Sequence, residues 1–313
     1  MTKISYVIPC YRSEKTIKGV VNEIIETVSG LPDSTCEIIL VNDSSPDNTL
    51  SVIEELAAAH DEVTGIDMTK NFGQHAALMA GFHFVTGDYV VCLDDDGQTP
   101  PCESVKLIDK LKEGYDAVYA RYDHKAHSAF RNFGSRVNSY MAETMLNKPK
   151  ELYISSYFAA KRIIIDEILR YQNPYPYIQG LVLRSTNKIC NVDVEHRARQ
   201  EGRSGYSFGK LMALWINGFT SFSVKPLRIA MYCGLFTAFV GFLFLIYVLI
   251  VKLSNNPNTP LGWSSTMAVI LLIGGMNLIV LGMIGEYIGR MYISMNNSPQ
   301  YVIRKVISGK EEK

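Results

Sequence analysis

The sequence has no excess of charge of either sign. Its 31 Lys and Arg residues balance 31 Asp and Glu residues, so the formal net charge at pH 7 is zero. Such a chain has no overall field that attracts nucleic acid or an acidic partner, and electrostatic function must come from local clusters. Nor does it have the polar composition of a disordered chain, because 47% of its 313 residues are hydrophobic. This is enough for a sizeable core.

The six cysteines lack the paired spacing of a metal site or a disulfide framework. None belongs to a CxxC motif, and several lie inside apolar runs. This distribution is typical of reduced thiols in a cytosolic domain. The first residues, MTKISYVIPCY, also lack the basic head, apolar middle and cleavage site of a signal peptide. We therefore expect the N-terminal part to stay where it is made.

Short apolar runs alternate with segments of helical spacing over the first 122 residues. Strands are predicted at 4–9, 37–42, 63–68, 89–94 and 117–122. Helices are predicted to begin near Ser13, Pro46, Gly73 and Cys102. Strands that alternate with helices form β-α-β units, with a mostly parallel sheet covered on both faces. The pattern predicts a Rossmann-like α/β nucleotide-binding domain, which we place at residues 1–206.

Two long uncharged stretches follow this domain. They run over 229–251 and 263–285, and the polar turn SNNPNTP joins them. Each is long enough to cross about 30 Å of hydrocarbon at ~1.5 Å per residue. The pattern predicts a transmembrane hairpin over 227–293, followed by a tail at 294–313. Basic residues flank the outer ends of the hairpin, so we expect a multi-pass protein of the cytoplasmic (inner) membrane with both chain ends cytoplasmic.

Residues 207–226 join the domain to the hairpin. They mix Phe, Leu and Trp with few charges. This composition is typical of an amphipathic helix that lies in the membrane interface. A buried connecting helix is the alternative.

Three consecutive aspartates stand where the fourth predicted strand ends, in VCLDDDGQTPP. Side chains alternate along a strand, so Asp94 and Asp96 share a face and Asp95 points away. Two carboxylates at such a short distance repel each other unless a cation binds between them. Oxygen ligands suit Mg²⁺ or Mn²⁺, and the amide of Gln98 adds another oxygen. The alternative is that the acids only cap the next helix, but capping requires one acid rather than three.

Other polar residues are predicted at the same edge of the sheet. Pro9, Tyr11 and Glu14 lie around the end of the first strand, and Asp43 follows the second. Ligands bind at the carboxyl ends of parallel strands, where an acid can accept hydrogen bonds from a ribose or a base. Asp43 alone is also a common turn residue.

Seven segments, in this order, resemble the inverting family 2 glycosyltransferases with a GT-A fold. They are VIPCYRSE, VNDSSPDNT, KNFGQHAALMAG, DDDGQTPP, VEHRARQEGRSGYSFGKL, SFSVKPLRI and GEYIGRMYI. Within that family the chain is similar to the membrane-anchored branch that includes dolichol-phosphate mannose synthase and bacterial undecaprenyl-phosphate glucosyl- and aminoarabinosyl-transferases. The resemblance implies transfer of a sugar from a nucleotide-sugar, expected to be a UDP-sugar, to undecaprenyl (polyprenyl) phosphate. The reaction would occur on the cytoplasmic leaflet and serve cell-envelope glycan modification.

The resemblance also implies roles for single residues. The nucleotide is expected to contact Pro9, Tyr11, Glu14, Asp43 and Asp94. The metal, Mg²⁺ or Mn²⁺, is expected at Asp94, Asp96 and Gln98. The acceptor phosphate is expected at Arg121, Arg131 and Ser135, and the catalytic set at Asp94, Asp96, Arg121 and Arg131.

The residues themselves support some of these roles. Arg131 and Ser135 are four positions apart and share a helix face, which suits an anion. Arg136 competes with Arg131, and a basic helix face exposed to solvent is the alternative. A Gly-containing lid over the diphosphate is expected at His196, Arg199 and Ser204. The same loop has the composition of a basic anchor on anionic lipid.

The sequence differs from relatives in two places. It has DDDGQTPPC where the family commonly reads DADLQDPPE, and it has no carboxylate in SSYFAAKR (155–162), where many relatives carry a candidate base. A phosphate acceptor has a second pKa of about 6 and is already mostly ionised at neutral pH, so it needs no base.

Two other functions stay open. One is a glycosyltransferase whose acceptor is a lipid or glycan hydroxyl, and the other is a catalytically silent, membrane-tethered scaffold that binds nucleotide. The expected partners are the nucleotide-sugar, the polyprenyl phosphate, the bilayer, further copies of the chain in a homo-oligomer such as a tetramer, and a separate flippase. No nucleic-acid partner is expected.

Overall fold

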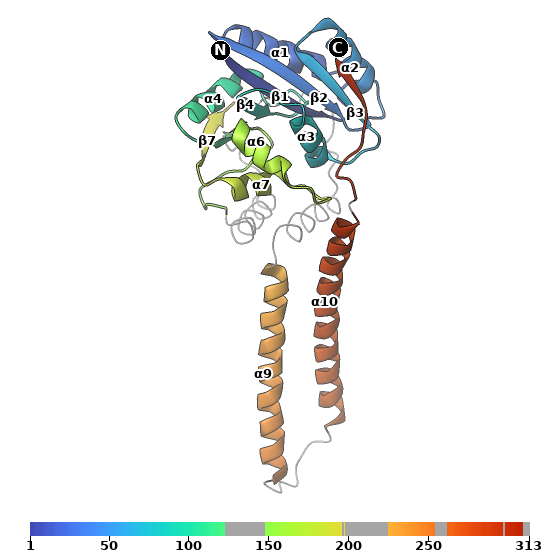
Figure 1. The fold of residues 1–313 in the computed structure, drawn as a ribbon. Helices are drawn as coiled ribbons and strands as arrows, with labels where there is room; N and C mark the ends of the chain where they lie inside the picture. The colour runs from blue at the N-terminus through green and yellow to red at the C-terminus, as the bar shows by residue number, and fades with distance from the viewer. Residues whose placement is uncertain (123–147, 196, 198–224, 254–261, 297, 309–313) are drawn as a thin grey trace. The chain divides into compact units, whose positions relative to one another are not determined.

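The computed structural model describes residues 1–122, 148–195, 197, 225–253, 262–296 and 298–308. It divides into two compact units. One comprises Met1–Met212 together with Ser298–Lys313, and the other comprises Ala213–Asn297 (Figure 1). The first unit is an α/β domain, and the described residues of the second are mainly helical.

The α/β domain is built on an eight-stranded sheet with the order β7-β5-β6-β4-β1-β2-β3-β8. The strands are β1 Thr2–Cys10, β2 Ser34–Asn42, β3 Val63–Met68, β4 Tyr89–Cys92, β5 Ala117–Tyr122, β6 Phe158–Lys161, β7 Ile189–Val194 and β8 Ile303–Ser308. Strand β1 pairs in parallel with β2 and β4, β2 with β3, and β5 with β7. Strands β6 and β8 are antiparallel to their neighbours. The predicted fold class, a GT-A-like and mostly parallel sheet, is confirmed.

Helices cover both faces of this sheet. They are α1 Ile17–Ser29, α2 Thr49–Ala59, α3 Gln74–Phe82, α4 Ser104–Lys112, α6 Arg162–Leu169 and α7 Ile178–Ser185, with a 3-10 turn at Pro101–Glu103. Apolar residues of α1, α2 and α4 share one core cluster with β1 and β2. Helix α3 packs on the opposite face, where an added Cβ on Gly81 would lie 2.5 Å from Val7 Cγ1. Glycine at this position therefore permits the close approach of α3 to β1.

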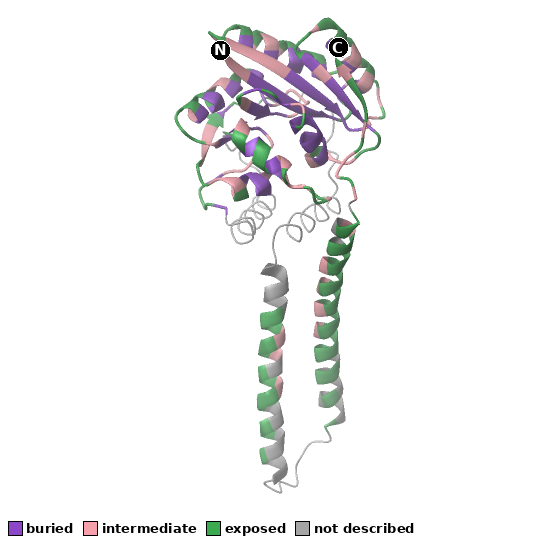
Figure 2. Cartoon of the chain, viewed as in Figure 1, coloured by how far each residue is buried: buried purple, intermediate pink, exposed green. Residues whose placement is uncertain are grey.

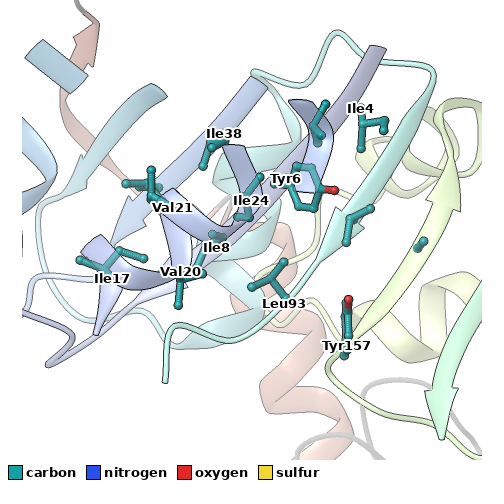
Figure 3. Close-up of a cluster of buried hydrophobic side chains, with 14 of the residues drawn as sticks. Ile4, Tyr6, Ile8, Ile17, Val20, Val21, Ile24, Ile38, Leu93 and Tyr157 are labelled. Atoms are coloured by element: carbon teal, nitrogen blue, oxygen red, sulfur yellow. The ribbon is translucent and has the colours of Figure 1, made fainter. Parts of the chain in front are cut away.

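The core forms where β1 meets α1. Ile4, Tyr6 and Ile8 of β1 belong to one buried cluster with Val20 and Ile24 of α1 (Figure 3). Because both faces of the central strands are covered, these strands are buried along most of their length (Figure 2). This explains why their sequences are continuous apolar runs rather than alternating patterns.

The first two helices begin three or four residues later than the sequence predicts. Helix α2 begins at Thr49 rather than near Pro46, because the hydroxyl of Ser45 does not cap the helix but donates to the Asp47 carboxylate. Helix α1 likewise begins at Ile17 rather than near Ser13. The residues between strand and helix form loops at the carboxyl edge of the sheet.

Strands β6, β7 and β8 were not predicted. Strand β8 lies in the segment 294–313, which the sequence suggested to be a tail, and it pairs with β3 at the edge of the sheet. Its partner strand is more than two hundred positions away in the sequence, so no local pattern indicates the pairing.

The second unit contains α9 Lys225–Leu253 and α10 Trp263–Met295, which include the predicted spans 229–251 and 263–285. Over the described residues, one stretch, Leu272–Ile293, is long and apolar enough to cross a membrane, and a shorter apolar stretch occurs at Met231–Leu243. Two crossings therefore stay a prediction. The predicted interfacial helix 207–226 lies outside the described residues except for its last two positions, which begin α9.

Candidate functional site

The loops that follow β1, β2, β3 and β4 meet at one edge of the sheet. The parallel register places Cys10 opposite Asn42 and Asn42 opposite Asp67, so these strands end side by side. The predicted nucleotide and metal residues on the described part of the chain are on or beside these loops. The fold therefore brings them to the place where α/β proteins bind ligands.

Asp94 is held at both carboxylate oxygens. Gln74 Nε2, from the first residue of α3, donates to Oδ1 over 2.9 Å, and Ser156 Oγ donates to Oδ2 over 2.5 Å. Burial raises the pKa of Asp94 to about 6, and the negative charges of Asp96 and Asp95 act in the same direction. The two donors oppose this shift and fix the orientation of the carboxylate.

Asp95 has different partners from Asp94, although β4 ends at Cys92 and the three aspartates lie in the turn after it rather than on the predicted strand 89–94. Its Oδ2 accepts hydrogen bonds from the backbone N–H of Tyr11, over 3.0 Å, and from the hydroxyl of Ser13. The middle aspartate therefore anchors the β1–α1 loop. Burial raises its pKa, although the two bonds lower it.

Asp96 and Gln98 form a tight turn. The backbone N–H of Gln98 donates to Asp96 Oδ1 over 3.1 Å, and Gly97 between them has a φ of 71°, which favours glycine. The backbone N–H of Arg197 donates to the carbonyl oxygen of Gln98 over 3.0 Å, and Gln98 Nε2 lies 3.5 Å from the carbonyl oxygen of Arg197. This turn is therefore fixed from the loop that follows β7.

The oxygen donors Asp94, Asp96 and Gln98 fit a hard divalent cation by their chemistry. Carboxylate and amide oxygens are the ligands that Mg²⁺ and Mn²⁺ prefer. Within the part of the chain that the structure describes, no group of three or more His, Cys, Asp or Glu side chains forms a metal cluster. A bound metal would thus depend on the two aspartates, the Gln98 amide and oxygens of the substrate.

The β1–α1 and β2–α2 loops hold each other. Glu14 Oε2 accepts a hydrogen bond from the Asn48 N–H over 3.0 Å, and the Glu14 N–H lies 3.4 Å from Asp47 Oδ2. Tyr11 keeps 44% of its surface exposed and stacks beside Arg12, whose guanidinium carbon is 5.6 Å from the ring centre. The exposed ring is available to a ligand. Pro9, by contrast, lies within β1 and is buried.

Asp43 anchors the loop before α3. Its carboxylate accepts the N–H groups of Phe72, over 2.7 Å, and Gly73, over 2.9 Å. Burial raises its pKa, while these two bonds lower it. Gly73 has a φ of 90° and precedes Gln74, so the loop that Asp43 holds also delivers Gln74 to Asp94.

Arg121 is in a bidentate ion pair. Its Nε and Nη2 donate to the two oxygens of Asp193 over 2.6 and 2.9 Å, across the paired strands β5 and β7. The hydrogen bond from Arg121 lowers the pKa of Asp193. The other predicted residues for the acceptor and the lid, Arg131, Ser135, His196, Arg199 and Ser204, lie outside the described residues.

Sequence reasoning missed four residues that shape this site. Gln74, Ser156, Ser13 and Asp95 had no role assigned, although Gln74 stands in the KNFGQHAALMAG segment. The carboxylate sought near Ser155 is absent, and the neighbouring Ser156 instead donates to Asp94. That contact joins residues 62 positions apart, which no local pattern indicates.

A GT-A-like sheet that gathers acidic residues at the ends of β2 and β4 has the architecture expected of a glycosyltransferase. The comparison with known families agrees. Residues 5–169 match glycosyl transferase family 2, and residues 225–291 match the GtrB C-terminal hairpin. The chain belongs to glycosyl transferase family 2, and it is an enzyme of the glycosyltransferase class.

Two relatives match nearly the whole chain. An uncharacterised glycosyltransferase of Bacillus subtilis (strain 168) is 32% identical over 302 residues, which cover 96% of this chain and 93% of that protein. The undecaprenyl-phosphate 4-deoxy-4-formamido-L-arabinose transferase of Proteus mirabilis (strain HI4320) is 32% identical over 313 residues, which cover 99% of this chain and 96% of that protein.

A solved structure shares the fold. Glucosyl-3-phosphoglycerate synthase of Mycobacterium tuberculosis, in complex with Mn²⁺, UDP-glucose and phosphoglyceric acid, aligns with a TM-score of 0.52 at 20% identity. The alignment covers 71% of this chain and 78% of that one. At this identity the likeness supports the fold alone.

Proposed function

We propose that the protein transfers a sugar from a nucleotide-sugar, expected to be a UDP-sugar, to undecaprenyl phosphate or another polyprenyl phosphate. The observation that carries the proposal concerns the hydrogen bond from Ser156 to Asp94. Residues 155–162, where many relatives carry a candidate base, have the hydroxyls of Ser155, Ser156 and Tyr157 instead, and Ser156 donates to the Asp94 carboxylate. An acceptor that is already ionised suits a site of this kind. The relative named as an undecaprenyl-phosphate transferase supports the same acceptor.

The reaction is a displacement at the anomeric carbon. An acceptor phosphate oxygen forms a bond to that carbon while the carbon–oxygen bond to the nucleotide diphosphate breaks, with inversion. Tyr11, Glu14 and Asp43, with Pro9 behind them, are proposed to line the nucleotide site. Asp94, Asp96 and Gln98 would hold Mg²⁺ or Mn²⁺, which when bound neutralises charge on the departing diphosphate. The carboxylate and amide oxygens of these residues are the ligand types that a hard divalent cation prefers.

Cationic groups are needed to bring one anion toward another. Arg121 is proposed to do so together with Arg131 and Ser135, and it would exchange Asp193 for the acceptor phosphate. His196, Arg199 and Ser204 are proposed to close over the diphosphate. The catalytic set in this proposal is Asp94, Asp96, Arg121 and Arg131.

The proposal includes the membrane arrangement. The catalytic domain 1–206 is placed on the cytoplasmic leaflet, with an interfacial helix at 207–226, a hairpin at 227–293 and both termini cytoplasmic. The match of residues 225–291 to the GtrB C-terminal hairpin supports the hairpin, and the basic flanks in the sequence support the placement of the termini. A homo-oligomer, such as a tetramer, and a separate flippase that moves the product complete the proposal.

A direct assay tests the function. Membranes that contain the full-length protein are incubated with undecaprenyl phosphate, Mg²⁺ or Mn²⁺ and a panel of UDP- and GDP-sugars, and the lipids are analysed by mass spectrometry. The expected product has the mass of a polyprenyl phosphate joined to one sugar. A product on a lipid or glycan hydroxyl, with none on undecaprenyl phosphate, would replace the proposed acceptor, and nucleotide binding without any product would favour the silent scaffold.

A further inference from the structure

The chain returns to the sheet after α10. The N–H of Thr69 donates to the carbonyl oxygen of Val302 over 2.9 Å, and β8 then pairs with β3. The register passes from Asp67 opposite Lys305 to Met68 opposite Ile303 and skips Arg304. Arg304 is therefore the extra residue of a β-bulge, a feature that redirects a side chain at the edge of a sheet.

The bulge directs the Arg304 side chain toward the end of β3. Its guanidinium lies 3.4 Å from Asp67 Oδ2, and Nη2 donates to the carbonyl oxygen of Thr69 over 3.1 Å. The Asp67 side chain is only 4% exposed, whereas that of Arg304 is 58% exposed. A buried carboxylate is costly unless it is paired, so the exposed arginine stabilises a charge inside the domain.

From Asp67 the contacts continue to the site loops. Asn42 Nδ2 donates to Asp67 Oδ1 over 2.7 Å, and Asn42 itself is buried. The N–H of Ser45 donates to Asn42 Oδ1 over 3.2 Å, and the N–H of Arg12 donates to Ser45 Oγ over 2.8 Å. A continuous series of polar contacts thus joins β8 to the β2–α2 and β1–α1 loops.

These loops contain backbone conformations that need support. Arg12 has a φ of 61° and Ser44 a φ of 50°, both in the left-handed region that non-glycine residues rarely adopt. Such residues stay in place only when the surrounding structure holds them. The bonds at Ser45 and Arg12 provide that support, and Tyr11 and Glu14 are on the same loop.

We propose that Arg304 is a positioning residue, which fixes the shape of the nucleotide-binding loops through Asp67, Asn42 and Ser45. The ligand of these loops rests on the proposed function, while the positioning role is a property of the fold. The strand that follows the C-terminal hairpin thereby controls how tightly the domain holds its donor.

Backbone amide exchange in the full-length protein in detergent tests the positioning role. We compare Arg304→Met with a matched control, Lys305→Met, which removes a neighbouring exposed charge that pairs with Glu54. Arg304→Met is expected to speed exchange of the amides of residues 11–14, 44, 45, 47 and 48 by about fivefold, in line with the loss of a charged hydrogen bond. Lys305→Met should leave these amides unchanged. Arg304→Lys keeps the charge and should restore part of the protection.

Nucleotide affinity provides the second measurement. With UDP and Mg²⁺ as the probe, calorimetry should show a dissociation constant about fivefold higher for Arg304→Met and unchanged for Lys305→Met. The apparent KM for undecaprenyl phosphate should not move in either variant.

Three results would overturn the proposal: unchanged loop exchange in Arg304→Met, equally faster exchange in α4, which would indicate general destabilisation, or faster loop exchange with unchanged UDP affinity. A wild-type protein that binds neither UDP nor GDP refutes the proposed function instead, and loop exchange then decides the role of Arg304 by itself.

Discussion

Gln74 Nε2 lies 2.9 Å from Asp94 Oδ1, and this contact joins the first residue of α3 to the acidic turn after β4. Ser156 Oγ completes the arrangement from the opposite oxygen. The carboxylate is therefore held from two separate parts of the chain, and these two contacts fix its orientation.

Removal of either donor should slow the reaction more than it destabilises the fold. Ser156→Ala and Gln74→Ala are each expected to lower kcat about tenfold, since a misoriented Asp94 loses roughly 1.4 kcal/mol of transition-state stabilisation. Ser155→Ala is the control, because its hydroxyl donates to the backbone carbonyls of Ala120 and Tyr157 rather than to Asp94. Equal losses of kcat in the Ser155 and Ser156 variants would contradict this role.

The metal prediction depends on the charge of Asp96. Asp96→Asn keeps the side-chain volume but removes the charge, so we expect loss of metal-dependent turnover with an unchanged melting temperature. Turnover of the wild-type protein should likewise disappear with a chelator and return with Mg²⁺ or Mn²⁺. Near-normal turnover of Asp96→Asn in chelator would show that the site works without a metal.

The acceptor prediction uses the Arg121–Asp193 ion pair. Arg121→Gln is expected to raise the apparent KM for undecaprenyl phosphate by about tenfold or more, because a charge-assisted bond to phosphate is lost. The KM for the nucleotide-sugar should stay constant. Asp193→Asn removes only the competing anion and should not raise the acceptor KM. If Arg121→Gln instead weakens donor binding alone, Arg121 belongs to the diphosphate site.

The stability of the α/β domain should depend on Glu37 in acid. Burial raises the pKa of Glu37, but hydrogen bonds from Lys3, Ser5 and Thr86 outweigh burial and lower it below the usual value. A carboxylate with a depressed pKa stabilises the fold above its unfolded pKa, about 4.3, and this contribution disappears as the pH falls through the folded value.

Glu37→Gln should therefore lower stability at pH 7, by about 1–2 kcal/mol, and the difference from wild type should shrink below about pH 4. Denaturant unfolding of the α/β domain, followed over a range of pH, measures this difference in the free energy of unfolding. Exposed Glu55, which pairs with Lys18 at the surface, provides the control, and Glu55→Gln should change stability little at any pH. A difference in stability between Glu37→Gln and wild type that becomes larger in acid would contradict the predicted pH dependence.

The predicted topology is tested by labelling. In a background without the exposed Cys102 and Cys233, a cysteine at Asn256 should react with an impermeant reagent applied from outside the inner membrane. A cysteine at Lys310 should react only after the membrane is opened. Both positions lie outside the described residues, so the expectation rests on the sequence. The reverse labelling pattern would contradict the placement of both termini in the cytoplasm.

The sequence predicted the central strands well because they are continuous apolar runs bounded by turns. The runs 4–9 and 37–42, for example, lie within β1 and β2. It missed β6, whose four residues, FAAK, are too short for a periodic signal, and β8, whose pairing partner β3 is distant in the chain.

In the site, the sequence could place the three aspartates just after a strand, because the apolar run that ends there is a local signal. The sequence could not indicate the contacts of Ser156 and Asp67. Ser156 lies close to Asp94 because β6, which follows Ser156, pairs antiparallel with β4. The role of Asp67 depends on its contact with Arg304, which comes from the far end of the chain. Contacts of this kind depend on the three-dimensional path of the chain.

The position of β8 also sets an order of events during synthesis. Because the N-terminal part of a chain emerges and folds first, β1 to β7 are complete while β3 still has an unpaired edge. That edge stays open until α9 and α10 have been made. The last strand then covers it with the charged residues Arg304 and Lys305, which discourage association with other sheets. Completion of the helical unit thus precedes closure of the sheet, and a nascent chain that lacks its final residues exposes the unpaired edge of β3, where other strands can pair.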